Sequence, residues 1–182
     1  YLPTQDPVHE ISIIPRGMAG GYTMYRPTED KSFISKTEML ENIVSLLGGR
    51  VSESIVLDDI STGASNDIER ATQLAKAMVT KYGMSERIGT IMLGSDQDEV
   101  FLGRDLAQER SYSEETAGII DEEMKKIIDW AYGQAKNILE EHRDKLDAVA
   151  GVLMEKEKIT GEEFDKILKD NINEQIKAPE KL

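Results

Sequence analysis

Apolar residues recur at intervals of three and four along most of this chain, and that spacing places them on one face of an α-helix. Small polar residues precede several of these stretches, as expected where a helix begins. The pattern therefore predicts a mainly α-helical fold. The stretches with this pattern follow Ser35, run from Ile68 to Tyr82, from Ser111 to Leu139 and from Arg143 to Glu155, and begin again at Thr160.

Two glycines leave the extent of the first predicted helix open. The capping box Ser35-Lys36-Thr37-Glu38 starts this helix, and Gly48-Gly49 could stop it. Alternatively the helix continues to Glu53, and the glycines permit another backbone to approach closely. Each interior glycine costs about 1 kcal/mol relative to alanine, so propensity alone does not decide between the two.

Near the N-terminus the periodicity changes to the alternation typical of strands. Residues 7–15 are rich in β-branched side chains, residues 16–21 turn the chain, and residues 22–26 indicate a second strand. We therefore expect a small β-hairpin. His9 lies in the first of these strands and the fourth residue after it is Ile13, so His9 is interpreted as a hairpin residue and not as a zinc ligand.

The run Ser61-Thr62-Gly63-Ala64-Ser65-Asn66-Asp67 has the composition of a helix start and carries a carboxylate. Small polar residues are expected to cap the free N–H groups, and Asp67 lies at the positive end of the helix dipole. Gly83 is the expected C-cap of the same helix. A carboxylate held in this way can be a metal ligand, a general base or simply an N-terminal charge, and the residues alone favour the last.

Composition narrows the classes of function. The 35 acidic and 22 basic residues give a formal net charge of −13, and no basic stripe with interleaved aromatic residues offsets it, so nucleic-acid binding is not expected. The lack of cysteine excludes disulfides and thiolate metal sites. There is no apolar run of about 18 residues and no signal-like N-terminus, which predicts a soluble chain that would reach a membrane only through other segments.

Four short motifs occur in order along the chain, and the third contains Asp67. They are Ile14-Pro15-Arg16-Gly17, Leu46-Leu47-Gly48-Gly49-Arg50, Thr62-Gly63-Ala64-Ser65-Asn66-Asp67-Ile68-Glu69-Arg70-Ala71-Thr72 and Tyr82-Gly83-Met84-Ser85. Together they resemble the protease domain of the FtsH family of membrane-anchored, ATP-dependent zinc metalloproteases. The resemblance implies that Asp67 is the third protein ligand of the catalytic zinc and that the first helix continues through its two glycines.

In that family the other two zinc ligands and the general-base glutamate lie in a helical H-E-x-x-H motif. The sequence has only two histidines, His9 and His142, and neither lies in such a motif. The family motif lies a short distance upstream of the segment matching Tyr1, so we interpret the chain as beginning just after it. The resemblance thus implies that no catalytic residue is in this chain, that the parent binds zinc and that this fragment alone is inactive.

The resemblance further implies a parent protein that degrades unfolded or membrane proteins and uses ATP in a domain outside this sequence. That parent would be a homo-hexamer at the cytoplasmic face of a bacterial inner membrane, or at an organellar membrane. The small sheet would lie beside the catalytic cleft. The alternative is a non-catalytic α-helical module for interaction or oligomerisation, which the lack of a self-contained catalytic set supports.

The domain organisation follows from the same reasoning. We interpret residues 1–170 as a partial peptidase domain, with residues 1–110 as the catalytic part lacking the zinc helix, residues 111–170 as a helical part and residues 171–182 as a frayed tail. In the helical part, Trp130 lies on a periodic face and is expected in the core rather than as an anchor for a partner. His142 is interpreted as part of a solvated helix end rather than of a metal site.

Overall fold

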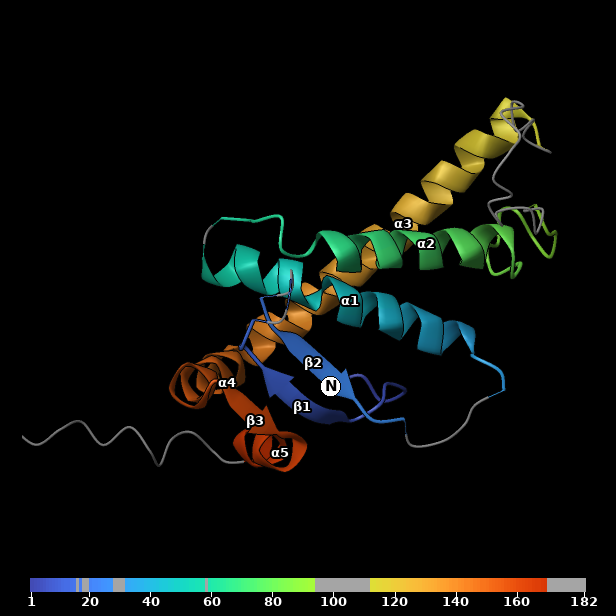
Figure 1. Ribbon diagram of the computed structural model, residues 1–182. Helices are drawn as coiled ribbons and strands as arrows, with labels where there is room; N and C mark the ends of the chain where they lie inside the picture. Colours follow the sequence, from blue (N-terminus) through green and yellow to red (C-terminus); the bar gives the residue numbers. More distant parts are fainter. Residues whose placement is uncertain (16, 18–19, 28–31, 58, 94–111, 170–182) are drawn as a thin grey trace, which may run out of the picture. The chain divides into compact units, whose positions relative to one another are not determined.

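The computed structural model confirms the expected mainly α-helical fold (Figure 1). The described residues are 1–15, 17, 20–27, 32–57, 59–93 and 112–169. In chain order their elements are β1 (Val8–Ser12), β2 (Tyr22–Tyr25), α1 (Lys36–Val56), α2 (Ser65–Thr80), α3 (Glu114–Glu141), α4 (Arg143–Lys156), β3 (Lys158–Thr160) and α5 (Gly161–Lys169). Within these residues no helix combines the length and the hydropathy needed to cross a membrane.

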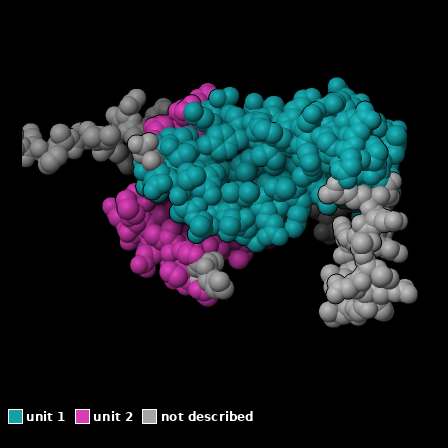
Figure 2. All heavy atoms as spheres, turned by 90° about the horizontal axis from the view of Figure 1, so that it is seen from above, with its two compact units in different colours: residues 1–4, 33–137 teal, residues 5–32, 138–182 magenta. Residues whose placement is uncertain are grey.

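The chain forms two compact units, which are coloured separately in Figure 2. The helical unit comprises Tyr1–Thr4 and Phe33–Asn137, and it contains α1, α2 and most of α3. The sheet unit comprises Gln5–Ser32 and Ile138–Leu182, and it contains the strands, the end of α3, α4 and α5. The units are therefore interleaved along the chain.

The expected boundary near residue 110 and the expected frayed tail stay predictions. Residues 94–111 and 170–182, on which both depend, lie outside the described residues. What the structure adds is that the first strands and the last helices of the chain belong to one unit. That grouping depends on the pairing of strands far apart in the sequence, which local sequence patterns do not show.

α1 and α2 pack together and supply most of the core of the helical unit (Figure 1). α1 begins where expected, because the Ser35 hydroxyl accepts a hydrogen bond from the Glu38 N–H at 3.2 Å. Fully burying a side chain such as Ile43 contributes about 1.5–3 kcal/mol, so this shared face stabilises the helix pair. The buried apolar residues of the two helices are Met39, Ile43, Val44, Leu47, Val51, Ala71, Ala75, Met78 and Val79.

α1 runs through Gly48 and Gly49 to Val56, which decides between the two alternatives for this helix. The expectation that these glycines admit another backbone is wrong for the part of the chain that the structure describes. A Cβ placed on either glycine would meet nothing within 4 Å there. The two glycines therefore weaken α1 without creating a contact in the described structure.

Replacing Gly48 or Gly49 with alanine is expected to raise the free energy of unfolding of the helical unit by about 0.5–1 kcal/mol in each case. Alanine loses less backbone freedom on entering a helix, and its methyl group has open space at both positions. Urea unfolding of the two single variants measures the change. A decrease in both would show that another surface covers these glycines in solution.

Gly83 lies just past α2, and its φ of +61° falls in the left-handed region. The expected C-cap at Gly83 is wrong, because Lys81 is the C-cap of α2. Gly83 follows two residues later, in a conformation that glycine adopts without strain. The Met84 N–H then donates to the Met78 carbonyl at 2.9 Å. The segment that follows is attached to α3 by a buried hydrogen bond of 2.8 Å from the Ser85 hydroxyl to the Glu123 carboxylate.

α3 is the long amphipathic helix predicted from the sequence, with one correction. Ser113 precedes it, and the Ser113 hydroxyl accepts a hydrogen bond from the Thr116 N–H at 3.2 Å. The prediction that Trp130 lies in the core is wrong, because this side chain is 44% exposed. The next residue, Ala131, is fully buried instead. The buried face of α3 therefore includes Ala131, and the indole lies partly in solvent.

The strands of the described residues form one antiparallel sheet in the order β2-β1-β3. The predicted hairpin is confirmed as β1 and β2, with a register shift between Val8 and Glu10. His9, at this shift, is an exposed strand residue as interpreted. β3 has too few residues to show alternation in a sequence. It pairs with β1 through Ile11 and the fully buried Ile159.

α5 is joined to the sheet by a reciprocal cap. The Glu163 N–H donates to the Thr160 hydroxyl at 3.3 Å, and the Thr160 N–H donates to the Glu163 carboxylate at 3.0 Å. Gly161, the first residue of α5, lies so close to β1 that a Cβ would overlap the carbonyl oxygen of Val8. A residue without a side chain is therefore required at this position.

Glu163 also accepts a 2.6 Å hydrogen bond from the Lys156 ammonium group. This bond, together with the contacts from Thr160, lowers the pKa of Glu163 from 4.5 to about 2. Because the pKa is lowered in the folded state, the carboxylate contributes to stability above about pH 4.5. That contribution is lost as the pH falls towards the folded pKa of about 2.

A carbon-13 NMR titration of the Glu163 side chain is expected to show an inflection near pH 2. Lys156→Gln should move the inflection up towards 4.5, because it removes the first cause of the shift. The control is Lys166→Gln, which removes the charge of a lysine in α5. This variant should leave the inflection near pH 2. An inflection near 4.5 in the unaltered chain would show that this contact does not form in solution.

Candidate metal site

Asp67 is the third residue of α2 and lies in its first turn, as predicted. Its side chain is 46% exposed, and its Oδ1 lies 3.7 Å from the Arg70 Nη1. An exposed ion pair of this kind contributes about 0–1 kcal/mol, so the carboxylate can exchange it for another partner. The side chain lies at the positive end of the helix dipole, where a negative charge interacts favourably with the free N–H groups.

The expectation that small polar side chains cap α2 is wrong. The N-cap is Ala64, and no side chain of the described residues makes a capping hydrogen bond to α2. Backbone groups take over part of this role: the Ser65 N–H donates to the Thr62 carbonyl at 3.1 Å, and the Ile68 N–H donates to the Ala64 carbonyl at 3.0 Å. The turn before Asp67 therefore depends on contacts from another element.

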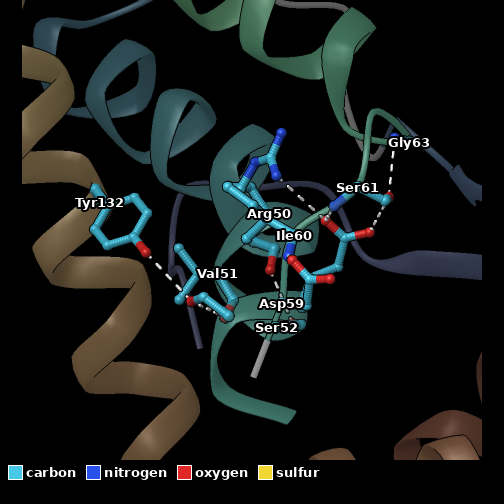
Figure 3. Close-up of polar contacts among 11 residues, drawn as sticks. Arg50, Val51, Ser52, Asp59, Ile60, Ser61, Gly63 and Tyr132 are labelled. Atoms are coloured by element: carbon cyan, nitrogen blue, oxygen red, sulfur yellow. Dashed lines mark hydrogen bonds and ion pairs between the residues drawn. The ribbon is translucent and has the colours of Figure 1, made fainter. Parts of the chain in front are cut away.

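Those contacts come from the end of α1 (Figure 3). The Glu53 carboxylate accepts two hydrogen bonds from Ser61, one from the hydroxyl group and one from the N–H at 3.3 Å. The Ser61 hydroxyl in turn accepts a hydrogen bond from the Gly63 N–H at 3.1 Å. Glu53 is thereby connected to the turn that leads into α2.

Arg50 completes this arrangement from the preceding turn of α1. Its Nη1 lies 3.6 Å from the Glu53 Oε2, and the two side chains are only 18% and 23% exposed. The hydrogen bonds from Ser61, together with the positive charge of Arg50, hold the pKa of Glu53 below its usual value. The Arg50 Nη1 is buried and makes no hydrogen bond within the described residues. We call the contacts among Arg50, Glu53 and Ser61 the Ser61 clamp.

Sequence reasoning did not single out the residues of the Ser61 clamp as a group. The available signal is the spacing of Arg50 and Glu53, because opposite charges three residues apart share one helix face. Ser61 carries no such signal, since it is one of several small polar residues before α2. Only the fold shows that its hydroxyl is directed to α1 rather than to the N-terminus of α2.

The candidate ligand, Asp67, could offer a metal one carboxylate group. Carboxylate oxygen is a usual zinc ligand, and this one is accessible. No group of three or more His, Cys, Asp or Glu side chains that could hold a metal occurs in the described part of the chain. His9 and His142 both belong to the sheet unit, where His142 is the N-cap residue of α4. The geometry fits one ligand of a metal site rather than a complete site.

Comparison with known proteins identifies the family. The sequence model of peptidase family M41 matches residues 1–167. The chain belongs to peptidase family M41. This assignment agrees with the resemblance carried by the four motifs.

Two similar proteins are both named as FtsH metalloproteases. The M41 chain is 58% identical over 175 residues to the ATP-dependent zinc metalloprotease FtsH of Caldicellulosiruptor bescii, a match that covers 96% of the chain and 28% of that protein. It is 61% identical over 166 residues to the ATP-dependent zinc metalloprotease FtsH 1 of a Thermoanaerobacter species, covering 91% of the chain and 27% of that protein. The M41 chain thus spans less than a third of the length of these relatives.

Proposed function

We propose that this chain is the protease part of a zinc metalloendopeptidase, in which Asp67 supplies the third protein ligand of the catalytic zinc. The observation that carries the proposal is the position of this carboxylate, which is half-exposed in the first turn of a packed helix and only weakly paired with Arg70. The names of the relatives support the metal and the reaction, since they describe zinc metalloproteases.

Under this proposal, two histidines and a general-base glutamate from an H-E-x-x-H motif outside this sequence complete the site. Bound zinc supplies the Lewis acidity that polarises the scissile carbonyl and acidifies a water. Asp67 binds the metal through a carboxylate oxygen, and the packing of α2 against α1 keeps that oxygen in place. The 182-residue chain alone, which offers this one ligand, does not hydrolyse peptides.

The proposal extends to the parent protein. It uses ATP in a domain outside this sequence. The relatives' names describe ATP-dependent proteins, which supports the use of ATP. From the family resemblance, it assembles as a homo-hexamer and degrades unfolded or membrane proteins. It is held at the cytoplasmic face of a bacterial inner membrane, or at an organellar membrane, by segments outside this sequence.

The zinc content per chain tests the proposed role of Asp67. Elemental analysis would be made on a polypeptide extended upstream by about 25 residues, which is enough for one helix of 10–14 residues and its lead-in. We expect about one zinc per chain, lost in Asp67→Ala. Glu69→Gln is the matched control, because it removes a nearby carboxylate of α2 and should keep the zinc.

Zinc content that is indifferent to Asp67→Ala would overturn the proposal. Asp67 would then be a charge that stabilises the N-terminus of α2 and nothing more. The non-catalytic helical module would become the better explanation of the chain.

A further inference from the structure

The Glu53 side chain of α1 anchors the turn between α1 and α2. Glu53 accepts hydrogen bonds from both the hydroxyl and the N–H of Ser61. The Ser61 hydroxyl also accepts the Gly63 N–H, and the turn is so tight that a Cβ on Gly63 would lie 3.2 Å from the Ser61 Oγ. Because Ala64 gives α2 no side-chain cap, the start of this helix takes its position from Ser61 and Gly63.

The end of α1 that carries Glu53 makes contacts with other helices. Glu53 lies in the last turns of α1, which packs along α2. The next residue, Ser54, has its hydroxyl 3.2 Å from the Tyr132 hydroxyl of α3, in hydrogen-bond contact (Figure 3). The end of α1 is therefore attached to two other helices. Arg50 supplies a compensating charge, which allows Glu53 to stay ionised with little exposure to water.

An ionised Glu53 is the form that the geometry requires. Its two carboxylate oxygens accept two different donors of Ser61, whereas amidation replaces one of these oxygens with an NH2 group and protonation turns one into a hydroxyl donor. The pKa of Glu53 is lowered by these same hydrogen bonds, so the carboxylate is ionised at neutral pH. The clamp thus holds the turn under the conditions in which a zinc ligand would act.

We infer that Arg50, Glu53 and Ser61 are positioning residues for Asp67, which hold the turn before α2 so that the Asp67 carboxylate presents its oxygen to the metal. The inference rests on the proposed function, because it concerns the same site. Contacts that support a metal ligand typically change metal affinity about 10–100-fold when they are removed. The Ser61 clamp is expected to act on this scale although none of its residues touches the metal.

Hydrogen exchange on the full-length parent protein, free of zinc, tests whether the clamp holds the turn. In Glu53→Gln, the amides of Ser61 and Gly63 are expected to exchange about tenfold faster. The reason is that one of the two hydrogen bonds that Ser61 donates to Glu53 is lost. The amide of Ala75, in the buried face of α2, should keep its protection. Glu69→Gln, which lies outside the clamp, should change neither.

Zinc affinity of the same protein, measured by competition with a chelator, tests whether the clamp positions the ligand. Glu53→Gln and Ser61→Ala are expected to weaken zinc binding about 10–100-fold. Ser61→Thr keeps the hydroxyl group and should retain the original affinity. Glu69→Gln should also retain it, which separates the loss of the clamp from the loss of one negative charge near α2.

The outcomes distinguish this inference from the proposed function. Zinc affinity that is unchanged in Glu53→Gln and Ser61→Ala, but lost in Asp67→Ala, would overturn the positioning role and leave the proposed function standing. Zinc affinity that is unchanged in Asp67→Ala would overturn the proposed function and this inference with it. Weaker zinc binding in Glu53→Gln without faster exchange of the Ser61 amide would also overturn the inference. Glu53 would then affect zinc binding by some means other than holding the turn before α2.

Discussion

Replacing Gly161 with alanine is expected to lower the free energy of unfolding of the sheet unit by about 3 kcal/mol. The added Cβ would overlap the carbonyl oxygen of Val8 and would lie 3.4 Å from the Cα of His9. Both neighbours are backbone atoms of β1, the central strand, so neither can rotate away as a side chain would. Relief requires α5 to move away from β1, which loosens its packing on the sheet.

Urea unfolding, followed by hydrogen exchange of the amides in β1 and β3, measures this effect. Gly151→Ala in α4 is the matched control in the same unit, because a Cβ there meets nothing within 4 Å of the described atoms. That variant should be more stable by about 0.5–1 kcal/mol. A Gly161→Ala chain as stable as the unaltered one would show that α5 does not approach β1 this closely in solution.

Replacing Asp67 with alanine is expected to lower kcat/KM for peptide cleavage by the parent protein by more than about 100-fold, beyond the range of changes to supporting contacts. In the proposed role, Asp67 supplies the oxygen that completes the zinc site, whereas α2 would lose only a weak ion pair with Arg70. The measurement is cleavage of a short fluorogenic peptide with zinc present, which requires no unfolding of the substrate by ATP.

The control for this experiment is Arg70→Gln. It removes the same ion pair but leaves the carboxylate, so it should cleave the peptide at nearly the original rate. Far-ultraviolet circular dichroism should show that both variants keep their helices. Cleavage by Asp67→Ala at the original rate would contradict the ligand role. Zinc-dependent cleavage by the 182-residue chain alone would contradict its proposed inactivity.

The helices of this chain can be predicted because their signals are local. Ser35 caps α1 through a donor three residues away, and apolar residues such as Ile43 and Leu47 recur on one face of the same helix. Gly83 adopts the left-handed conformation that its residue type favours. Each of these features depends on neighbours in the sequence, so a pattern is enough to find it.

The features that were predicted wrongly or missed depend on distant parts of the chain. Periodicity places Trp130 on an apolar face, but the packing of α3 buries the adjacent Ala131 and leaves the indole half in water. Three residues of β3 become a strand only because β1 offers an edge. The glycines in α1 pack against nothing in the described structure, although their type suggested a close approach.

Some features of the candidate site also follow from local sequence, whereas others appear only in the folded structure. The position of Asp67 in the first turn of a helix follows from the residues around it, and the structure confirms that position. Its role as a zinc ligand comes from the family resemblance and stays a prediction. The Ser61 clamp depends on α1 and α2 lying beside each other, so neither spacing nor composition could show which side chain holds the turn.

β1 pairs on one side with β2, which follows it closely in the sequence, and on the other side with β3, which follows about 150 residues later. At a synthesis rate of about 5–20 residues per second, β1 waits about 8–30 s for this second partner. Closing so long a loop costs little extra free energy, because the entropy grows only with the logarithm of the length, but it slows folding. During that interval the free edge of β1 can pair with other chains. The sheet unit is therefore the part of the molecule expected to mature last on the ribosome and to depend most on chaperones.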